Sequence, residues 1–332
     1  MAIGESQTKE DAEGGGDGIE ANVGWRHTLS KIKGDATARF GLYVIAIVGT
    51  IAVVTTIDAN LSRLTLGRVE DFRLAESIWY HPERHPAPGE TERRMPPFFV
   101  EGGSIEHPLG TDRNGRDYIS RLVYGTRISF FVGIVATALG MIGGVVIGAV
   151  SGYYGGWIDD VLMRAVETLY AIPPLVLIIV FIVFISGGSP DIRFAVVGVG
   201  ITFIPVFARI IRSRVLSVRE MDYIEAARAA GVKDRTIIRR HVIPNSFAPV
   251  MVYATLQIGV TILIVAGLSF LGYGAQPPTP DWGEMLRIAH GRYMHANIWL
   301  SIWPGVAILV TIMGFNLFGD GLQDALDPRI ND

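Results

Sequence analysis

One stretch of the chain, residues 222–245, holds the side chains whose types and spacing best indicate a function. It reads DYIEAARAAGVKDRTIIRRHVIPN and lies between two apolar runs. Asp222 and Glu225 have the spacing of a capping box, in which two side chains bond the free amides at the start of a helix. Gly231 stands where a helix would end in a left-handed residue. The spacing therefore predicts a helix over 223–230 that ends in a tight turn.

A second short helix is predicted over residues 235–242. Asp234 can cap its start, because a side-chain oxygen can accept a hydrogen bond from an amide of the first turn. Pro244 is expected to end it, because proline disfavours the helical conformation in the residue before it. The whole stretch thus reads as helix, turn, helix.

Small and basic residues mark this stretch as a contact surface. Ala226, Ala227 and Ala230 give the first helix a small face that another backbone could approach closely. From Arg209 to Arg240 there are nine lysine and arginine residues against four acidic ones, a net charge of +5. A solvated hairpin on the cytoplasmic side would explain the charge, but not the ordered spacing of glutamate, alanines, glycine and proline.

The same spacing resembles the EAA loop of ABC-importer permeases, the cytoplasmic segment by which the membrane subunit holds its ATPase. His241 stands where the general pattern has an aliphatic residue, and Ile243 where it has leucine. The run from Arg240 to Asn245 is similar to the peptide-importer branch. The resemblance implies ATPase docking by Asp222, Glu225, Ala226, Ala227, Ala230, Gly231, Asp234, Arg239, Arg240, His241, Pro244 and Asn245.

Composition and hydropathy place the chain in a membrane. Of 332 residues, 49% are hydrophobic and 18% charged, and the mean hydropathy is +0.36, which is high for a soluble protein. Spans of about 17–25 apolar residues can cross the hydrocarbon core. We predict an all-α membrane protein with six transmembrane helices at 40–57, 128–150, 165–185, 194–211, 248–271 and 298–318.

The basic loop at 212–247 predicts the orientation, because cytoplasmic loops carry an excess of lysine and arginine. Counting spans from this loop puts both termini in the cytoplasm. The expected organisation is a disordered or amphipathic cytoplasmic N-terminus (1–38), a first transmembrane helix (39–60), an extracytoplasmic segment (61–127), a five-helix permease core (128–319) and a cytoplasmic tail (320–332). The protein is expected in the cytoplasmic (inner) membrane.

Three further motifs carry the family resemblance. The run HPLGTDRNGRDYISRLVYGTR at 107–127, the run FLGYGAQPPTPDWG at 270–283 and the run NLFGDGLQDALDPR at 316–329 resemble the C-subunit of dipeptide and oligopeptide importers. With the loop they place the resemblance over roughly residues 107–329, about two thirds of the chain. The resemblance implies the type I ABC-importer permease fold. Residues 58–106 match nothing in that family, and segments of this length without repeating pattern are often functional or disordered.

Ala136, Gly140, Gly144 and Gly148 recur every four residues in the second span. This small-residue pattern is typical of close helix packing in membranes. We expect these residues to pack against another helix and to bind nothing.

The sequence lacks the motifs of ATP-binding and metal-binding proteins, and this also bears on function. No Gly-x-x-x-x-Gly-Lys-Ser/Thr motif occurs, so we expect no ATPase activity in this chain, with ATP and magnesium held by the partner ATPase. The chain has no cysteine, and no histidine or carboxylate cluster has metal-ligand spacing. We predict no catalytic, cofactor or metal site and no nucleic-acid binding.

The resemblance implies a complex with a second homologous permease, two ATPase subunits and an extracytoplasmic substrate-binding protein, in contact with membrane lipid. Di- and oligopeptides are the expected substrates, with nickel or oligosaccharides as alternatives. A rival from another class is an ion-coupled secondary transporter. The lack of charged residues near the middle of the spans disfavours it, because such transporters bind at the midplane.

Overall fold

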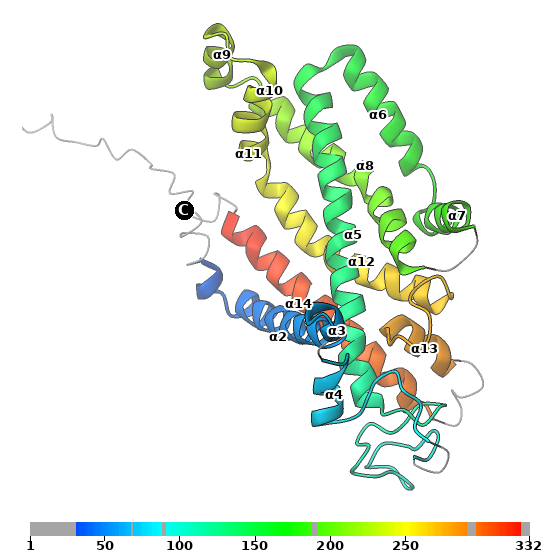
Figure 1. The fold of residues 1–332 in the computed structure, drawn as a ribbon. Helices are drawn as coiled ribbons and strands as arrows, with labels where there is room; N and C mark the ends of the chain where they lie inside the picture. Colours follow the sequence, from blue (N-terminus) through cyan, green and yellow to red (C-terminus); the bar gives the residue numbers. More distant parts are fainter. Residues whose placement is uncertain (1–30, 68, 88–90, 188–190, 291–296, 327–332) are drawn as a thin grey trace, which may run out of the picture.

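The structure, a computed structural model, describes residues 31–67, 69–87, 91–187, 191–290 and 297–326 (Figure 1). Within these ranges the regular secondary structure is helical, with connecting loops and one isolated β-bridge between Thr111 and Asp117, and the predicted all-α class is confirmed. The elements are α2 (Ala36–Asp58), α3 (Leu61–Leu64), α4 (Arg73–Ile78), α5 (Tyr118–Tyr154), α6 (Gly156–Tyr170), α7 (Pro174–Ser186), α8 (Ile192–Val218), α9 (Asp222–Ala229), α10 (Asp234–Ile237), η1 (Ile238–Val242), α11 (Ile243–Ser246), α12 (Ala248–Phe270), α13 (Trp282–His290) and α14 (Trp299–Leu326).

Five helices, α2, α5, α8, α12 and α14, are long and apolar enough to cross a membrane. The sixth predicted span is the pair α6 and α7, which together pass the same test but meet at an angle of 93°. The break falls at Pro173 and Pro174. Proline has no amide hydrogen to donate, and its ring clashes with the preceding helical turn. A helix therefore cannot continue straight through the pair. The expected span at 165–185 is therefore two short helices rather than one.

Several helices are longer than the apolar windows that predict them. The second spanning helix begins at Tyr118, before the predicted start at 128, and so includes the last part of the motif at 107–127. The fourth continues to Val218, which takes residues 212–218 out of the predicted loop. The last continues to Leu326, into the predicted tail. Hydropathy marks where the lipid contact ends, whereas the helices continue into polar surroundings.

Residues 1–30 and 327–332, which include most of the predicted tails, lie outside the described residues.

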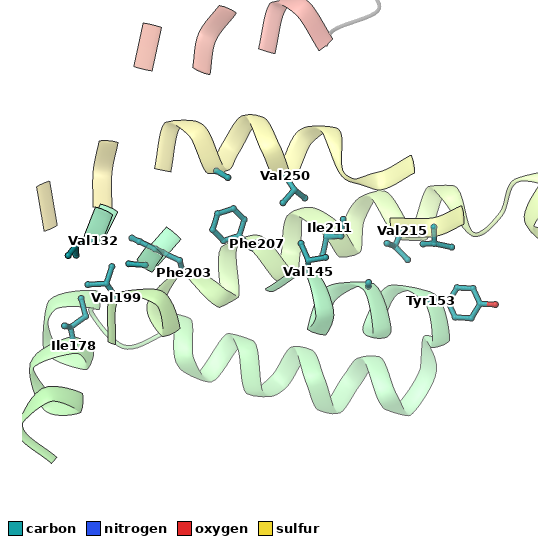
Figure 2. Close-up of a cluster of buried hydrophobic side chains, with 14 of the residues drawn as sticks. Val132, Val145, Tyr153, Ile178, Val199, Phe203, Phe207, Ile211, Val215 and Val250 are labelled. Atoms are coloured by element: carbon teal, nitrogen blue, oxygen red, sulfur yellow. The ribbon is translucent and has the colours of Figure 1, made fainter. Parts of the chain in front are cut away.

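The helices α5 and α8 form the centre of the fold, as the small-residue pattern predicts. A Cβ atom added to Gly140 would lie 2.7 Å from the carbonyl oxygen of Gly200, and one on Gly144 would lie 2.8 Å from the amide nitrogen of Ala208. The two backbones therefore touch, and only glycine permits that distance. Figure 2 shows the buried cluster that continues this contact, with Val145 of α5 beside Ile211 of α8.

Two ends of the molecule can be distinguished (Figure 1). At one end the start of α2 and the end of α14 pack together through Ala38, Leu322 and Ala325, and Val252 near the start of α12 joins them. Because α12 directly follows the predicted docking loop, the loop and these helix ends lie on the same side. At the other end Tyr118 of α5 donates a 2.5 Å hydrogen bond to the carbonyl of Leu300 in α14.

The segment between α2 and α5 folds over this second end. Asp58, which is fully buried, accepts hydrogen bonds from the amides of Leu74 (2.8 Å) and Ala75 (3.2 Å) and from the hydroxyl of Tyr124. Phe72 packs on the Tyr124 ring, with 5.6 Å between the ring centroids. One carboxylate thus ties the end of α2 to α4 and to α5.

The motif at 107–127 supplies a second set of buried polar contacts. Arg116 pairs with Asp112 at 2.7 Å, and both side chains are buried. Arg121, which is 1% exposed, donates to the carbonyls of Pro82 at 2.9 Å and Pro278 at 3.2 Å. These bonds join the start of α5 to two loops that are far away in the sequence.

Candidate functional site

The loop between α8 and α12 contains all twelve predicted docking residues, and its inner side is apolar. Ile224 of α9, Ile237 of α10 and Val242 of η1 are fully buried and join the cluster built on α5 and α8. Burying an aliphatic side chain stabilises a structure by about 1.5–3 kcal/mol. Three such anchors hold the loop firmly on its own subunit.

The predicted caps are wrong in detail. Met221, not Asp222, is the N-cap of α9, and Lys233, not Asp234, is the N-cap of α10; neither helix has a side-chain cap. Each aspartate is instead the first residue of its helix, and Glu225 lies in the first turn of α9. Negative charge there favours a helix through the helix dipole, so the acidic residues still suit their places without the capping bonds.

Gly231 turns the chain between the two helices, as predicted. Its φ is +76°, in the left-handed region that favours glycine. Its amide bonds the carbonyl of Arg228 at 2.9 Å, and the amide of Val232 bonds that of Ala227 at 3.1 Å. No other atom lies within 4 Å of the place where a Cβ would be, so conformation alone requires glycine here.

The prediction that Pro244 ends the second helix is wrong. The helix continues past it, but its hydrogen-bond pattern changes. Proline cannot donate to the carbonyl four residues earlier, which here belongs to Arg240. The chain forms a π-turn over Ile238–Val242, in which the amide of Ile243 bonds the carbonyl of Ile238. The side-chain amide of Asn245 donates to the carbonyl of His241 at 2.6 Å. Helical chain continues to Ser246, and the break before α12 falls at Phe247.

A tyrosine at the end of α5 binds both helices of the loop. The hydroxyl of Tyr153 donates to Asp234 at 2.8 Å and accepts from Nε of Arg228 at 3.3 Å. The Arg228 guanidinium also lies 5.0 Å from the centroid of the tyrosine ring. Asp234 of α10 and Arg228 of α9 are therefore held at one point, on a residue that is itself 5% exposed.

The base of the loop is tied to the spanning helices by ion pairs. Arg212 of α8 donates to both carboxylate oxygens of Asp159 in α6, at 2.7 and 2.5 Å, and Ser151 of α5 donates to the same carboxylate. Arg219, just after α8, donates to the carbonyl of Gly152 at 2.9 Å. These contacts join α5, α6 and α8 directly beneath the loop.

The outer side of the loop is small and charged. Ten of the twelve predicted docking residues are exposed, and Ala227 and His241 are half-buried. Ala227 packs partly against the buried cluster, so its side chain lies closer to the inner side than those of Ala226 and Ala230. The helical period explains this, because Ala227 lies three residues after the buried Ile224 and so on the inner side. The structure brings the other small residues, Ala226 and Ala230, together on the outer side.

Several charges on this outer side are unpaired. Among the residues that the structure describes, the side chains of Glu225, Arg239 and Arg240 make no ion pair or hydrogen bond. A groove of about 910 Å³ lies at the two ends of the loop, lined among others by Met221, Asn245 and residues of α12 and α14. The surface can therefore offer charges, small side chains and a hollow to another protein.

Sequence reasoning missed the residues that hold the loop in place. Tyr153 contacts Asp234 across 81 positions, and no local spacing indicates such a pair. The apolar anchors had a signal, because Ile224, Ile237 and Val242 are among the few large aliphatic residues within a charged stretch. In the described part of the chain no three histidine or carboxylate side chains come together as a metal site would require.

Comparison with known proteins assigns the family. Residues 144–332 match the family model described as binding-protein-dependent transport system inner membrane component. A dipeptide transport system permease protein DppC from Alkalihalophilus pseudofirmus is 42% identical over 231 residues, which cover 70% of this chain and 75% of the relative. A glutathione transport system permease protein GsiD from Pectobacterium atrosepticum is 44% identical over 230 residues, or 69% and 75%.

Solved structures support the fold. A chain of the MetNI methionine ABC transporter in an inward-facing conformation aligns with a TM-score of 0.52 at 19% identity, covering 62% of this chain and 97% of that one. At this identity the likeness shows the fold alone, which is that of an ABC-importer permease. The five unbroken spanning helices and the bent pair agree with a multi-pass membrane protein. The chain belongs to the binding-protein-dependent transport system inner membrane component family, as a permease subunit of the ABC-importer class in its peptide branch.

Proposed function

We propose that this permease imports di- or oligopeptides and forms half of a translocation pore with a second homologous permease. Two ATPase subunits, which hold ATP and magnesium, drive it, and an extracytoplasmic binding protein delivers the substrate. The peptide substrate is supported by the names of the dipeptide and glutathione relatives. Nickel and oligosaccharides remain the alternative cargoes of the same machinery.

Docking of the ATPase is assigned to the outer side of the loop, which is defined here as Asp222, Glu225, Ala226, Ala230, Gly231, Asp234, Arg239, Arg240, Pro244 and Asn245. The observation that carries this proposal is the contrast between its two sides. The apolar residues Ile224, Ile237 and Val242 are fully buried in the subunit, while the small and charged ones face outward. A segment held firmly on one side and open on the other suits the transmission of force from a partner.

The mechanism follows from how the loop is attached. When ATP closes the ATPase pair, the bound loops move with it. Because Tyr153 holds Arg228 and Asp234, and because Ile224 packs into the cluster of α5 and α8, the loop cannot move without these helices. The spanning helices then rotate as rigid bodies, and the pore changes from inward to outward opening.

The proposed orientation puts this loop and both termini in the cytoplasm. The packing of the start of α2 against the end of α14, next to the start of α12, supports a common side for all three. Cysteines introduced into this cysteine-free chain can test the orientation. Ser77→Cys, at an exposed site, should react with an impermeant thiol reagent in intact cells, whereas Lys233→Cys should react only after the cell is opened. The reverse pattern contradicts the orientation and the docking proposal with it.

The docking proposal is tested by purifying the complex from cells that express variants of the outer side. Ala226→Trp should lose the ATPase, because overpacking a close contact costs about 1–3 kcal/mol. Ala226→Ser keeps the side chain small and should retain it. Full retention of the ATPase by Ala226→Trp, with normal ATP turnover, would show that α9 does not face the ATPase.

A further inference from the structure

A cavity of about 400 Å³ is lined by residues of α4 and of the segment that leads from α4 to α5. This segment lies at the end of the molecule away from the loop between α8 and α12 (Figure 1). All residues of its wall lie between Glu76 and Asp117. Cavities of roughly 300–1,000 Å³ are the usual size of small-molecule sites. Neither the family resemblance nor the proposed transport cycle assigns a role to this wall.

The arginines of the wall are paired, whereas two of its carboxylates are not. Arg84 is paired with Glu76, with 2.7 Å between nitrogen and oxygen, and Arg116 is paired with Asp112 at the same distance. In contrast, the carboxylates of Glu92 and Glu106 have no partner among the described residues. On this wall Arg84 and Arg116 are thus paired with carboxylates, while the carboxylates of Glu92 and Glu106 remain unpaired.

His107 adds a buried acceptor. Its side chain is 3% exposed, and its Nδ1 lies 2.9 Å from a carboxylate oxygen of Asp117, which is 2% exposed. An ionised carboxylate can only accept, so Nδ1 donates and the unprotonated nitrogen of a neutral ring is Nε2. Within the described residues Nε2 has no hydrogen-bond partner, although the imidazole lines the cavity. In that neutral form Nε2 can accept a hydrogen bond from a donor group of a ligand.

Aromatic rings complete the wall. Trp79 and Tyr80 both line the cavity, and the Tyr80 ring lies 4.6 Å from the His107 ring, measured between centroids. Burial, and then the negative charges of Glu106 and Asp117, raise the pKa of Tyr80, which places these carboxylates near the phenol. Burial lowers the pKa of His81, so that imidazole adds no positive charge at neutral pH. Rings beside unpaired carboxylates attract organic cations.

We propose that this cavity is a binding site for a small organic ammonium ion, such as a free amine or the amino end of a short peptide. Glu92, Glu106 and Nε2 of His107 accept hydrogen bonds from the ammonium group, and Trp79 and Tyr80 cover it with their rings. The site goes beyond the proposed transport function. Its test needs neither the ATPase nor transport, so it can fail while the proposed function stands.

The first test is calorimetric titration of the purified full chain in lipid nanodiscs with L-alaninamide, a small primary ammonium ion. N-acetyl-L-alaninamide, which has no charge at that nitrogen, is the matched control ligand. We expect L-alaninamide to bind and the acetylated ligand not to bind. Equal binding of the two, or no binding of either, overturns the proposal. Tighter binding of L-alanyl-L-alanine than of L-alaninamide assigns the site to peptide amino ends, and weaker binding assigns it to free amines.

The second test uses variants of the wall. Glu106→Gln should weaken the binding of L-alaninamide roughly tenfold, the loss expected when one charge-assisted hydrogen bond is removed. Glu101→Gln changes an exposed glutamate of the same segment that does not line the cavity, and should leave binding unchanged. Trp79→Phe keeps a ring and should bind better than Trp79→Ala. Unchanged affinity in Glu106→Gln, or an equal loss in Glu101→Gln, contradicts the assignment.

Discussion

The two ends of this permease differ in where their charged residues lie and in what these residues contact. From the end of α2 to the start of α5, Asp58, Asp112, Arg116 and Arg121 are buried and bonded to groups of the same chain. In the loop between α8 and α12, most charged residues are exposed, and buried apolar side chains and the hydroxyl of Tyr153 attach the loop to the subunit. A buried charge is costly unless it is paired, so the four buried residues hold the first end together. The exposed charges of the second end, such as Glu225, Arg239 and Arg240, suit the proposed contact with an ATPase.

The largest effect should come from breaking the contacts of the first end. Asp58→Ala leaves two buried amides and the Tyr124 hydroxyl without an acceptor, so it should destabilise the protein by about 3 kcal/mol or more. Thermal unfolding of the purified chain measures this. Proteolysis should also cut the segment after α2 faster. Glu101→Ala, at an exposed site in the same segment, should change neither. An Asp58→Ala protein as stable as the parent would show that this carboxylate does not hold the segment.

The turn at Gly231 comes next. Gly231→Val forces a β-branched residue into positive φ, at a cost of roughly 1–3 kcal/mol of strain. Because the site is open to solvent, this strain should displace α9 from α10 without affecting membrane insertion. Uptake by cells should fall. Gly231→Asn should keep most of the uptake, since asparagine tolerates the left-handed region. Normal uptake by Gly231→Val means that the turn does not set the docking geometry.

A smaller effect is expected at the point that joins the loop to α5. Tyr153→Phe removes the hydroxyl that binds Asp234 and Arg228, at a cost of about 1 kcal/mol. Amide exchange in residues 222–242 should quicken, and ATP hydrolysis should become less dependent on substrate. Tyr154→Phe is the control, because Tyr154 is 46% exposed and its hydroxyl has no hydrogen-bond partner among the described residues. Identical exchange in the two variants would count against a coupling role for Tyr153.

The smallest effect belongs to the exposed charges of the docking loop. Arg239→Ala should weaken retention of the ATPase by less than about 1 kcal/mol, as for other exposed charge pairs. The difference from the parent should shrink in high salt, which screens such pairs. Arg193→Ala removes an exposed arginine from the first turn of α8, at the other end of that helix, and should not affect retention. A loss that does not depend on salt would mean that Arg239 is buried in the contact.

The sequence was sufficient for the parts that depend on local pattern. Apolar runs located five of the six predicted spans as single helices, and Gly231 located the turn, because both signals lie within a few neighbouring residues. The caps at Asp222 and Asp234 were misplaced by one residue, since packing of Ile224 and Ile237 decides where those helices begin. The contact of Tyr153 with Asp234 and the fold around Asp58 could not be predicted, because they join residues that are distant in the chain.

The length of α5 has a mechanical consequence. Its 37 residues span about 56 Å at 1.5 Å per residue, well beyond a hydrocarbon core of about 30 Å. The helix contains no proline, whereas α8 and α14 contain Pro205 and Pro304. One continuous helix without a proline therefore reaches from Tyr153, which binds the loop between α8 and α12, to Tyr118 and Arg121 at the other end. When this helix tilts as one body, its end at Tyr153 and its end at Tyr118 move in opposite directions. The two ends of the protein then move at the same time.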